Sequence, residues 1–281
     1  MKVKEAAESL QRVRELPSLR GVVLDLLGSL NDPQADVESV SAKVALDQAI
    51  TAKLLRLANS PFFGLSRQIT SVNDAAAIVG LRSLRNIAVA AALVDAFDPQ
   101  RCPAFALRPF WRHAIGVALA AEAMAPLCEL EAATAFSAGL LHDIGRLALA
   151  LALPETYSEL LQWQQEQDLP LLEAEQSRLG LTHCEAGAQL AEQWLLPPQL
   201  IRCIALHHQT ELREPDLLVD LIHLADNLCH ALDLGGDPGD AVPVFSLAGW
   251  QRLGLSNAQL LAVCKQTETR HESLCQALAI C

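Results

Sequence analysis

Aromatic residues and long apolar runs are both scarce in this chain of 281 residues. Phe, Trp and Tyr make up 4% of the sequence, although 51% of it is hydrophobic and rich in Leu and Ala. A β-sandwich needs aromatic and β-branched residues, so this composition favours packed helices. The longest apolar runs, such as residues 87–94, are far shorter than the roughly 18 residues that cross a bilayer, and the first residues carry no secretory apolar core. We therefore expect a soluble, cytoplasmic protein without a membrane partner.

Paired cysteines are also missing. The eight cysteines stand at separate positions, and no two of them form a Cys-x-x-Cys motif. Most fall within apolar helical patterns, where a free thiol behaves as a small hydrophobic residue. We therefore expect no disulfide scaffold.

Positive charge is sparse in the second part of the chain. Residues 101–281 contain 10 Lys or Arg and 22 Asp or Glu, whereas residues 1–100 contain 11 of each, so the net charge of −12 comes from the second part alone. An acidic body disfavours contact with phosphates, which speaks against a nucleic-acid partner. The basic residues of the first part are interpreted as solvated surface, with nucleic-acid binding as a weak alternative: Lys53, Arg56, Arg67, Arg82 and Arg85.

Three parts are predicted along the chain. Residues 1–100 read as short amphipathic helices, because apolar residues recur at helical spacing and Ser71-x-x-Asp74 resembles a capping box. Residues 98–103 resemble a linker, residues 101–235 form a second helical body, and a Gly-rich loop precedes a helical tail at residues 236–281. The evidence for any β-strand is poor, so the predicted fold is all-α, a multi-helix body with an N-terminal helical subdomain.

His142 and Asp143 are the first candidates for a functional site. They lie among apolar residues in the helical pattern of residues 137–146. A charged carboxylate is rarely buried unless it is paired or bound to a metal ion. Such a pair of neighbouring residues occurs by chance in most proteins, so its meaning depends on the rest of the chain.

Other helices are predicted to present further imidazoles and carboxylates from apolar sides. One such histidine alone is more often a hydrogen-bonded core residue, and imidazoles at a helix C-terminus are favourable when charged. Asp226 could likewise pair with His223 or His230 of its own helix. Five separate helices nevertheless each carry such a group, which indicates a site for one or two cations such as Fe, Mn or Zn. The candidate ligands are His113, His142, Asp143, His183, His207, His208 and Asp226.

The order of these residues resembles that of the HD superfamily of metal-dependent phosphohydrolases, and the later histidines are similar to those of its HD-GYP branch. Other segments resemble the HDOD family, the HD-related output domains, over roughly residues 12–232. The segments that carry this resemblance are Leu16-Pro17, Asn59–Gly64, Ile69–Val72, Ala75–Leu81, Phe110–His113, Gly139–Gly145 and His183–Gly187.

The resemblance implies a bacterial signalling module with protein partners, a receiver domain among them, and without established phosphohydrolase activity. The chain departs from the HD-GYP pattern at three points. Arg146, a candidate phosphate contact, replaces the usual lysine with a forked guanidinium. No Asp-Gly-x-Gly-Tyr-Pro loop follows His208, and Pro109 stands where three-metal members carry an acidic ligand, so two metals are the upper limit.

Two functions follow as hypotheses. We favour a non-catalytic scaffold or sensor in signal output, and the alternative is a metal-dependent phosphohydrolase acting on a nucleotide or a cyclic dinucleotide. Residues 62–64 (Phe-Phe-Gly) are candidates for a partner surface, or else the two rings fill the core between the parts.

Overall fold

The computed structural model describes residues 2–16, 37–45, 47–59, 68–80, 84, 87–88, 90–91, 102–209, 211–212, 214–237 and 242–280. These residues form helices and connecting turns, with no strand among them, so the prediction of an all-α fold is confirmed. The seven cysteines within these ranges are free thiols. Several predictions lie outside the described residues: the partner surface at 62–64, most of the linker at 98–103, and the basic residues 67, 82 and 85.

The helices follow one another along the chain with short connections. The N-terminal part contains α1 (Lys2–Arg14), α3 (Val37–Ala45), α4 (Gln48–Ala58) and α5 (Val72–Val79). The rest contains α7 (Leu107–Met124), η2 (Ala125–Cys128), α8 (Ala132–Leu141), α9 (Ile144–Ala152), α10 (Pro154–Gln167), α11 (Leu171–Arg178), α12 (His183–Gln193), α13 (Pro198–Leu206), α14 (Leu217–Ala231), α15 (Leu247–Leu253) and α16 (Asn257–Ala277).

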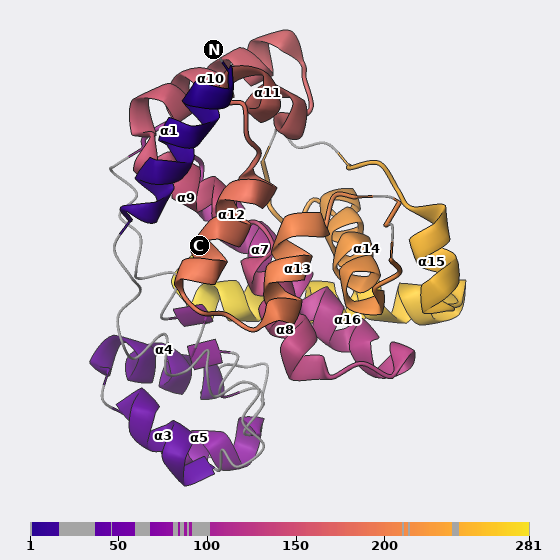
Figure 1. Ribbon diagram of the computed structural model, residues 1–281. Coiled ribbons are helices and arrows are strands. Elements are labelled where there is room, and N and C mark those ends of the chain that lie inside the picture. Colours follow the sequence, from indigo (N-terminus) through magenta and orange to yellow (C-terminus); the bar gives the residue numbers. More distant parts are fainter. Residues whose placement is uncertain are drawn as a thin grey trace.

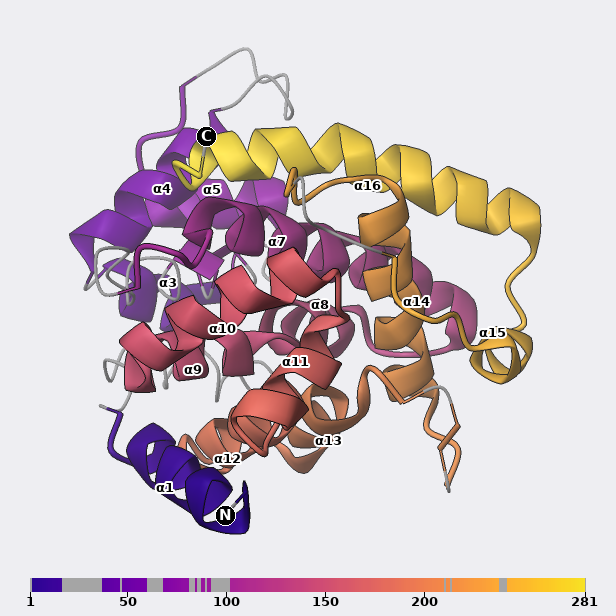
Figure 2. The same ribbon diagram turned by 90° about the horizontal axis from the view of Figure 1, so that it is seen from above.

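Helix α7 is the central helix of the body. It is rich in alanine and buried over most of its length, because α8, α14 and α16 pack against different sides of it (Figure 2). Small residues allow its backbone to approach that of α8. A Cβ atom added to Gly139 of α8 would lie 2.8 Å from the Cα atom of Ala118, so only glycine permits this contact.

The N-terminal helices do not all lie together. Helix α1 packs against α9 and α12 of the body, whereas α3, α4 and α5 pack against one another and reach the body through α4 and α16 (Figure 1). The tail helix α16 lies along α7 (Figure 2). The division at residues 100 and 235 stays a prediction, and the body draws helices from all three predicted parts.

One apolar stretch, Ala132–Ala152, is long and apolar enough to cross a membrane by composition alone. It comprises α8 and α9, which the turn at residues 142 and 143 separates. The most apolar window of the stretch is 83% buried within the protein, which is typical of a core segment in a soluble body.

Candidate metal centre

His142 and Asp143 occupy the turn between α8 and α9. The sequence pattern placed them inside one helix, but α8 ends at Leu141 and α9 begins at Ile144. Both residues are buried, at 1% and 5% exposed. The interruption sets a carboxylate at the N-terminus of α9 in the interior of the protein.

A backbone contact between α9 and α12 brings His183 to Asp143. Gly145 of α9 lies so close to α12 that an added Cβ atom would be 1.8 Å from the carbonyl oxygen of His183. A capping box is present at the start of α12, where Thr182 and Glu185 exchange hydrogen bonds, and it makes His183 the first residue of that helix. As a result, His183 Nε2 lies 3.2 Å from Asp143 Oδ1.

Three imidazoles surround Asp143 in the same orientation. The Nδ1 atoms of His142 and His207 donate hydrogen bonds to the carbonyl oxygens of Gly139 and Ile204, at 2.7 Å and 3.0 Å. His183 Nδ1 donates to a carboxylate oxygen at 2.7 Å. In each ring Nε2 therefore faces the interior. These three Nε2 atoms are buried and make no hydrogen bond within the described part of the chain.

A second set of imidazoles gathers on Asp226. The Nε2 atoms of His113, His230 and His142 lie 3.0, 3.2 and 3.6 Å from the same oxygen, Oδ1. His208 Nδ1 is 3.8 Å from the other oxygen, Oδ2, which is buried and has no hydrogen-bond partner among the described residues. His142 therefore lies between the two carboxylates, since its Nε2 is also 3.8 Å from Asp143 Oδ2.

Burial and the mutual charges set the protonation states. Burial lowers the pKa of His113, His207 and His208, the last to about 2, so these three rings are neutral at pH 7. Burial opposes the charged form of Asp143 and Asp226, yet the adjacent imidazoles hold the pKa of both carboxyls well below the usual range. This direction disfavours the alternative that His207 and His208 are charged residues at the end of a helix, and both alternatives stay predictions.

Comparison of the sequence with known proteins identifies the family of this chain. The sequence matches the model of the HDOD domain over residues 16–210. The chain belongs to the HDOD domain family. It is 28% identical over 249 residues to an uncharacterized protein of Treponema pallidum (strain Nichols), covering 85% of this chain and 47% of that protein. The chain thus spans about half the length of this curated relative.

Solved structures of similar sequence share the fold. An HDOD domain protein of unknown function from Geobacter sulfurreducens is 28% identical with a TM-score of 0.83, over 100% of this chain and 98% of that one. A "Putative phosphohydrolase" from Shewanella amazonensis SB2B is 26% identical with a TM-score of 0.74, over 95% and 98%. The MmoQ response regulator from Methylococcus capsulatus strain Bath is 29% identical with a TM-score of 0.51, over 88% and 98%.

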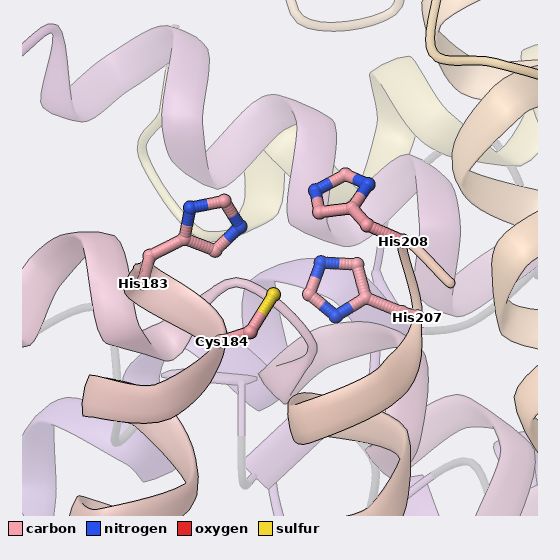
Figure 3. Close-up of side chains that lie close together, drawn as sticks. All are labelled: His183, Cys184, His207 and His208. Carbon is pink, nitrogen blue, oxygen red and sulfur yellow. The ribbon is translucent and has the colours of Figure 1, made fainter. Parts of the chain in front are cut away.

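The seven predicted ligands of this HDOD domain thus come together from α7, the α8–α9 turn, α12, the end of α13, and α14. Figure 3 shows the side chains of His183, Cys184, His207 and His208 pointing toward one another. Among the described residues, three groups of side chains have ligand atoms close enough together to hold an ion. They are His183–Cys184–His207–His208, His113–Asp226–His230 and His113–His142–Asp143.

The donor set of the HDOD domain fits divalent transition metals. Neutral imidazoles and ionised carboxylates are the forms that bind such cations. Burial opposes a charge on His142 and His183, but the neighbouring carboxylates raise the pKa of both, so these two rings would each release a proton when a metal ion binds. The Nε2 atoms of His142, His183 and His207 are buried, make no hydrogen bond among the described residues and already point inward. A buried polar atom without a hydrogen bond costs free energy unless something binds it. As ligands the seven residues remain a prediction, and the fit rests on these buried unpartnered atoms.

Glu175 of α11 was missed in the sequence. It is 0% exposed and accepts hydrogen bonds from the Nδ1 and backbone N of His183, both at 2.7 Å, and from the Tyr157 hydroxyl at 2.9 Å. Burial opposes a charge on His183, but Glu175 and Asp143 together hold its pKa well above the usual range. A signal did exist, because Leu171, Glu175 and Leu179 share one helical stripe, which predicts a carboxylate on an apolar side.

Helical spacing in the sequence left the contacts of three other polar residues of the HDOD domain open. Of the two suggested partners of Asp226, His230 is in contact with it, whereas His223 donates from Nδ1 to the carbonyl oxygen of His207 at 2.7 Å. Arg146 Nη1 bonds Asp143 Oδ2 at 3.1 Å, which places a guanidinium beside the cluster. Its role as a phosphate contact stays a prediction.

Proposed function

We propose that this chain is a regulatory output module of bacterial signal transduction, acting in the cytoplasm, whose metal centre is a scaffold or sensor and not a catalyst. Membership of the HDOD family and the likeness to MmoQ, described as a response regulator, support a place in signalling. A role in signalling requires protein partners, and a receiver domain is one candidate partner. Residues 1–100 are proposed as the subdomain that presents a surface to them.

The observation that carries the metal part of the proposal is the common orientation of three imidazoles. His142, His183 and His207 each have Nδ1 fixed by an acceptor and Nε2 directed toward Asp143. Acceptors on the second ring nitrogen are the usual support of metal-binding histidines. One or two divalent ions, of Fe, Mn or Zn, would bind these rings and so link α12 to the ends of α8 and α13.

Burial of the centre supports a role without turnover. The central groups His142, Asp143, His207 and Asp226 are at most 5% exposed. Among the described residues at the edge of the cluster, the Arg146, His208 and His230 side chains are 21%, 18% and 10% exposed. A phosphodiester substrate would need to pass these side chains to reach the central Nε2 atoms. A bound ion that acts by stabilising one conformation of the protein needs no such access for a substrate.

A metal-dependent phosphohydrolase acting on a nucleotide or a cyclic dinucleotide is the second candidate. Two carboxylates, Asp143 and Asp226, with imidazoles between and beside them, resemble a set for two metals, and Arg146 stands beside it. The solved structure from Shewanella amazonensis SB2B that is 26% identical to this chain is described as a "Putative phosphohydrolase". When bound, two metals would supply a Lewis acid and an activated water, and Arg146 would contact the phosphate.

One experiment separates the two candidates. Metal content of the purified chain would be measured together with hydrolysis of bis(p-nitrophenyl) phosphate and of cyclic dinucleotides. We expect about one or two transition-metal ions per chain and no turnover. The Asp143→Ala variant should lose metal and about 3 kcal/mol of stability, because it leaves buried partners uncompensated.

Two results would decide otherwise. Hydrolysis that requires metal and is lost in Asp143→Ala would establish the phosphohydrolase. Equal metal content in wild type and Asp143→Ala, or no metal after loading with each candidate ion, would refute the metal centre.

A further inference from the structure

One side chain in the cluster belongs to none of the predicted ligand positions. Cys184 follows His183 in the first turn of α12 and is 7% exposed. Its Sγ atom and one ring nitrogen each of His183, His207 and His208 all lie within 4.8 Å of one another. In Figure 3 the thiol and the three rings are directed toward a common centre.

Two of these rings are poised for a fourth donor. Nε2 of His183 and Nε2 of His207 are buried and without a hydrogen bond in the part of the chain that the structure describes. Their Nδ1 atoms are held by Glu175 and by the carbonyl oxygen of Ile204, so the inward direction of Nε2 is fixed. A free, buried thiol beside two fixed imidazole nitrogens that make no hydrogen bond among the described residues has the composition of a metal site and not only of apolar packing.

We propose that the Cys184 thiolate is a metal ligand and that His183, Cys184, His207 and His208 form a zinc position with three nitrogens and one sulfur. The inference rests on the proposed metal centre and specifies its metal. Thiolate is a soft donor that favours zinc, whereas a purely oxygen and nitrogen set suits manganese and iron as well. Binding converts the thiol to a thiolate, and the released proton goes to solvent.

The competing fourth donor is Asp143. Its Oδ1 atom lies 3.2 Å from Nε2 of His183 and 3.4 Å from Nε2 of His207, so the same two rings can share an ion with oxygen instead of sulfur. The choice has a functional consequence. Four protein donors including Cys184 close a tetrahedral zinc site, and closed sites are structural, whereas a catalytic zinc keeps one position open for water or substrate.

Cobalt(II) distinguishes sulfur from oxygen directly, because a thiolate ligand gives an intense near-ultraviolet charge-transfer band. The full chain would be stripped of metal and titrated with cobalt(II) and with zinc(II) against a chelator. Wild type should show the band, and Cys184→Ser should lose it while its zinc affinity falls on the order of 100-fold. The matched control is Cys229→Ser, a buried thiol on α14 outside the ion-binding groups, which should keep both.

The wild-type spectrum alone can overturn the inference, even if Cys184→Ser fails to fold. Cobalt bound without the charge-transfer band means that Cys184 is only a small buried side chain, and this result leaves the proposed metal centre intact. A band that persists in folded Cys184→Ser assigns the sulfur to another cysteine and refutes the inference as well. If neither cobalt nor zinc binds to wild type, the proposed metal centre fails together with it.

Discussion

Gly145→Ala tests whether the backbone contact between α9 and α12 builds the proposed metal centre. The added Cβ atom would lie 1.8 Å from the carbonyl oxygen of His183 and 2.7 Å from the amide nitrogen of Gly187. Carbon atoms keep about 3.0 Å from such atoms, so the helices must separate by roughly 1.2 Å. Both obstacles are backbone atoms and cannot rotate away. We estimate a packing cost of about 3 kcal/mol, offset by about 1 kcal/mol of helix propensity.

A net loss of about 2 kcal/mol corresponds to a fall in melting temperature of about 4 to 8 °C for a protein of this size. The same shift moves His183 Nε2 away from Asp143 Oδ1, from which it is now 3.2 Å distant, so metal affinity should fall as well. Thermal unfolding followed by circular dichroism and zinc titration against a chelator measure the two effects.

Gly116→Ala is the matched control. Its Cβ atom would meet the ends of the Leu234 and Cys229 side chains at 3.0 Å and 3.2 Å, and these can turn aside. We expect stability within about 1 kcal/mol of wild type and unchanged metal affinity. If Gly145→Ala melts and binds zinc like wild type, the contact between α9 and α12 does not position His183, and the reasoning is refuted.

Three further changes test other parts of the structure. Glu175→Gln should weaken zinc binding by about 10- to 100-fold, because a neutral amide replaces the carboxylate that orients the His183 ring. An unchanged zinc affinity in chelator competition would show that Glu175 is only a core residue. Burial lowers the pKa of His271, whose Nε2 donates to the Arg112 carbonyl oxygen. Below about pH 6.5 the unfolded chain therefore binds a proton at His271 more readily than the folded chain does. As a result, His271 does not reduce the free energy of unfolding above that pH, and it reduces this free energy as the pH falls below it. His271→Gln should lose less stability than wild type between about pH 7 and pH 5 in urea unfolding, and equal losses would contradict this. A fragment of residues 101–235 should be poorly soluble because it lacks α1 and α16, which cover the body; a monomeric fragment as stable as the full chain in gel filtration and unfolding would argue against one unit.

Much of the candidate site could be predicted because, on each helix, the candidate ligand lies on the same face as the core residues. His113 and Asp226 recur with apolar residues at helical spacing, which indicated buried polar groups on separate helices. The capping box at Thr182 fixed the start of α12 and therefore the place of His183. Local rules of this kind depend on residues within one or two turns, so a single sequence contains them.

Contacts between distant segments were beyond such rules. No local pattern in the sequence indicates that His271 of the tail helix reaches α7 at the Arg112 carbonyl, one residue before His113. Periodicity also continued through residues 137–146, because apolar residues occur on both sides of the break. The turn at His142 and Asp143 is a tertiary result of packing α8 and α9 against different neighbours.

The different supports of the three inward histidines follow from where each stands on its helix. A helix C-terminus leaves carbonyl oxygens without partners. His142 and His207 directly follow the last residues of α8 and α13, and each donates from Nδ1 to the carbonyl three residues earlier, Gly139 or Ile204. One bond thus satisfies an orphan carbonyl and directs Nε2 inward.

His183 stands at the opposite end of a helix, where the unsatisfied groups are N–H donors and no carbonyl is free. Its ring needs an acceptor from elsewhere, and its own backbone N–H needs one too. Glu175 meets both needs with a single carboxylate oxygen, Oε2, at 2.7 Å from each nitrogen. The inward direction of His183, at a helix N-terminus, therefore depends on a buried carboxylate from another segment, whereas His142 and His207 are oriented by carbonyl oxygens of the helices that they follow.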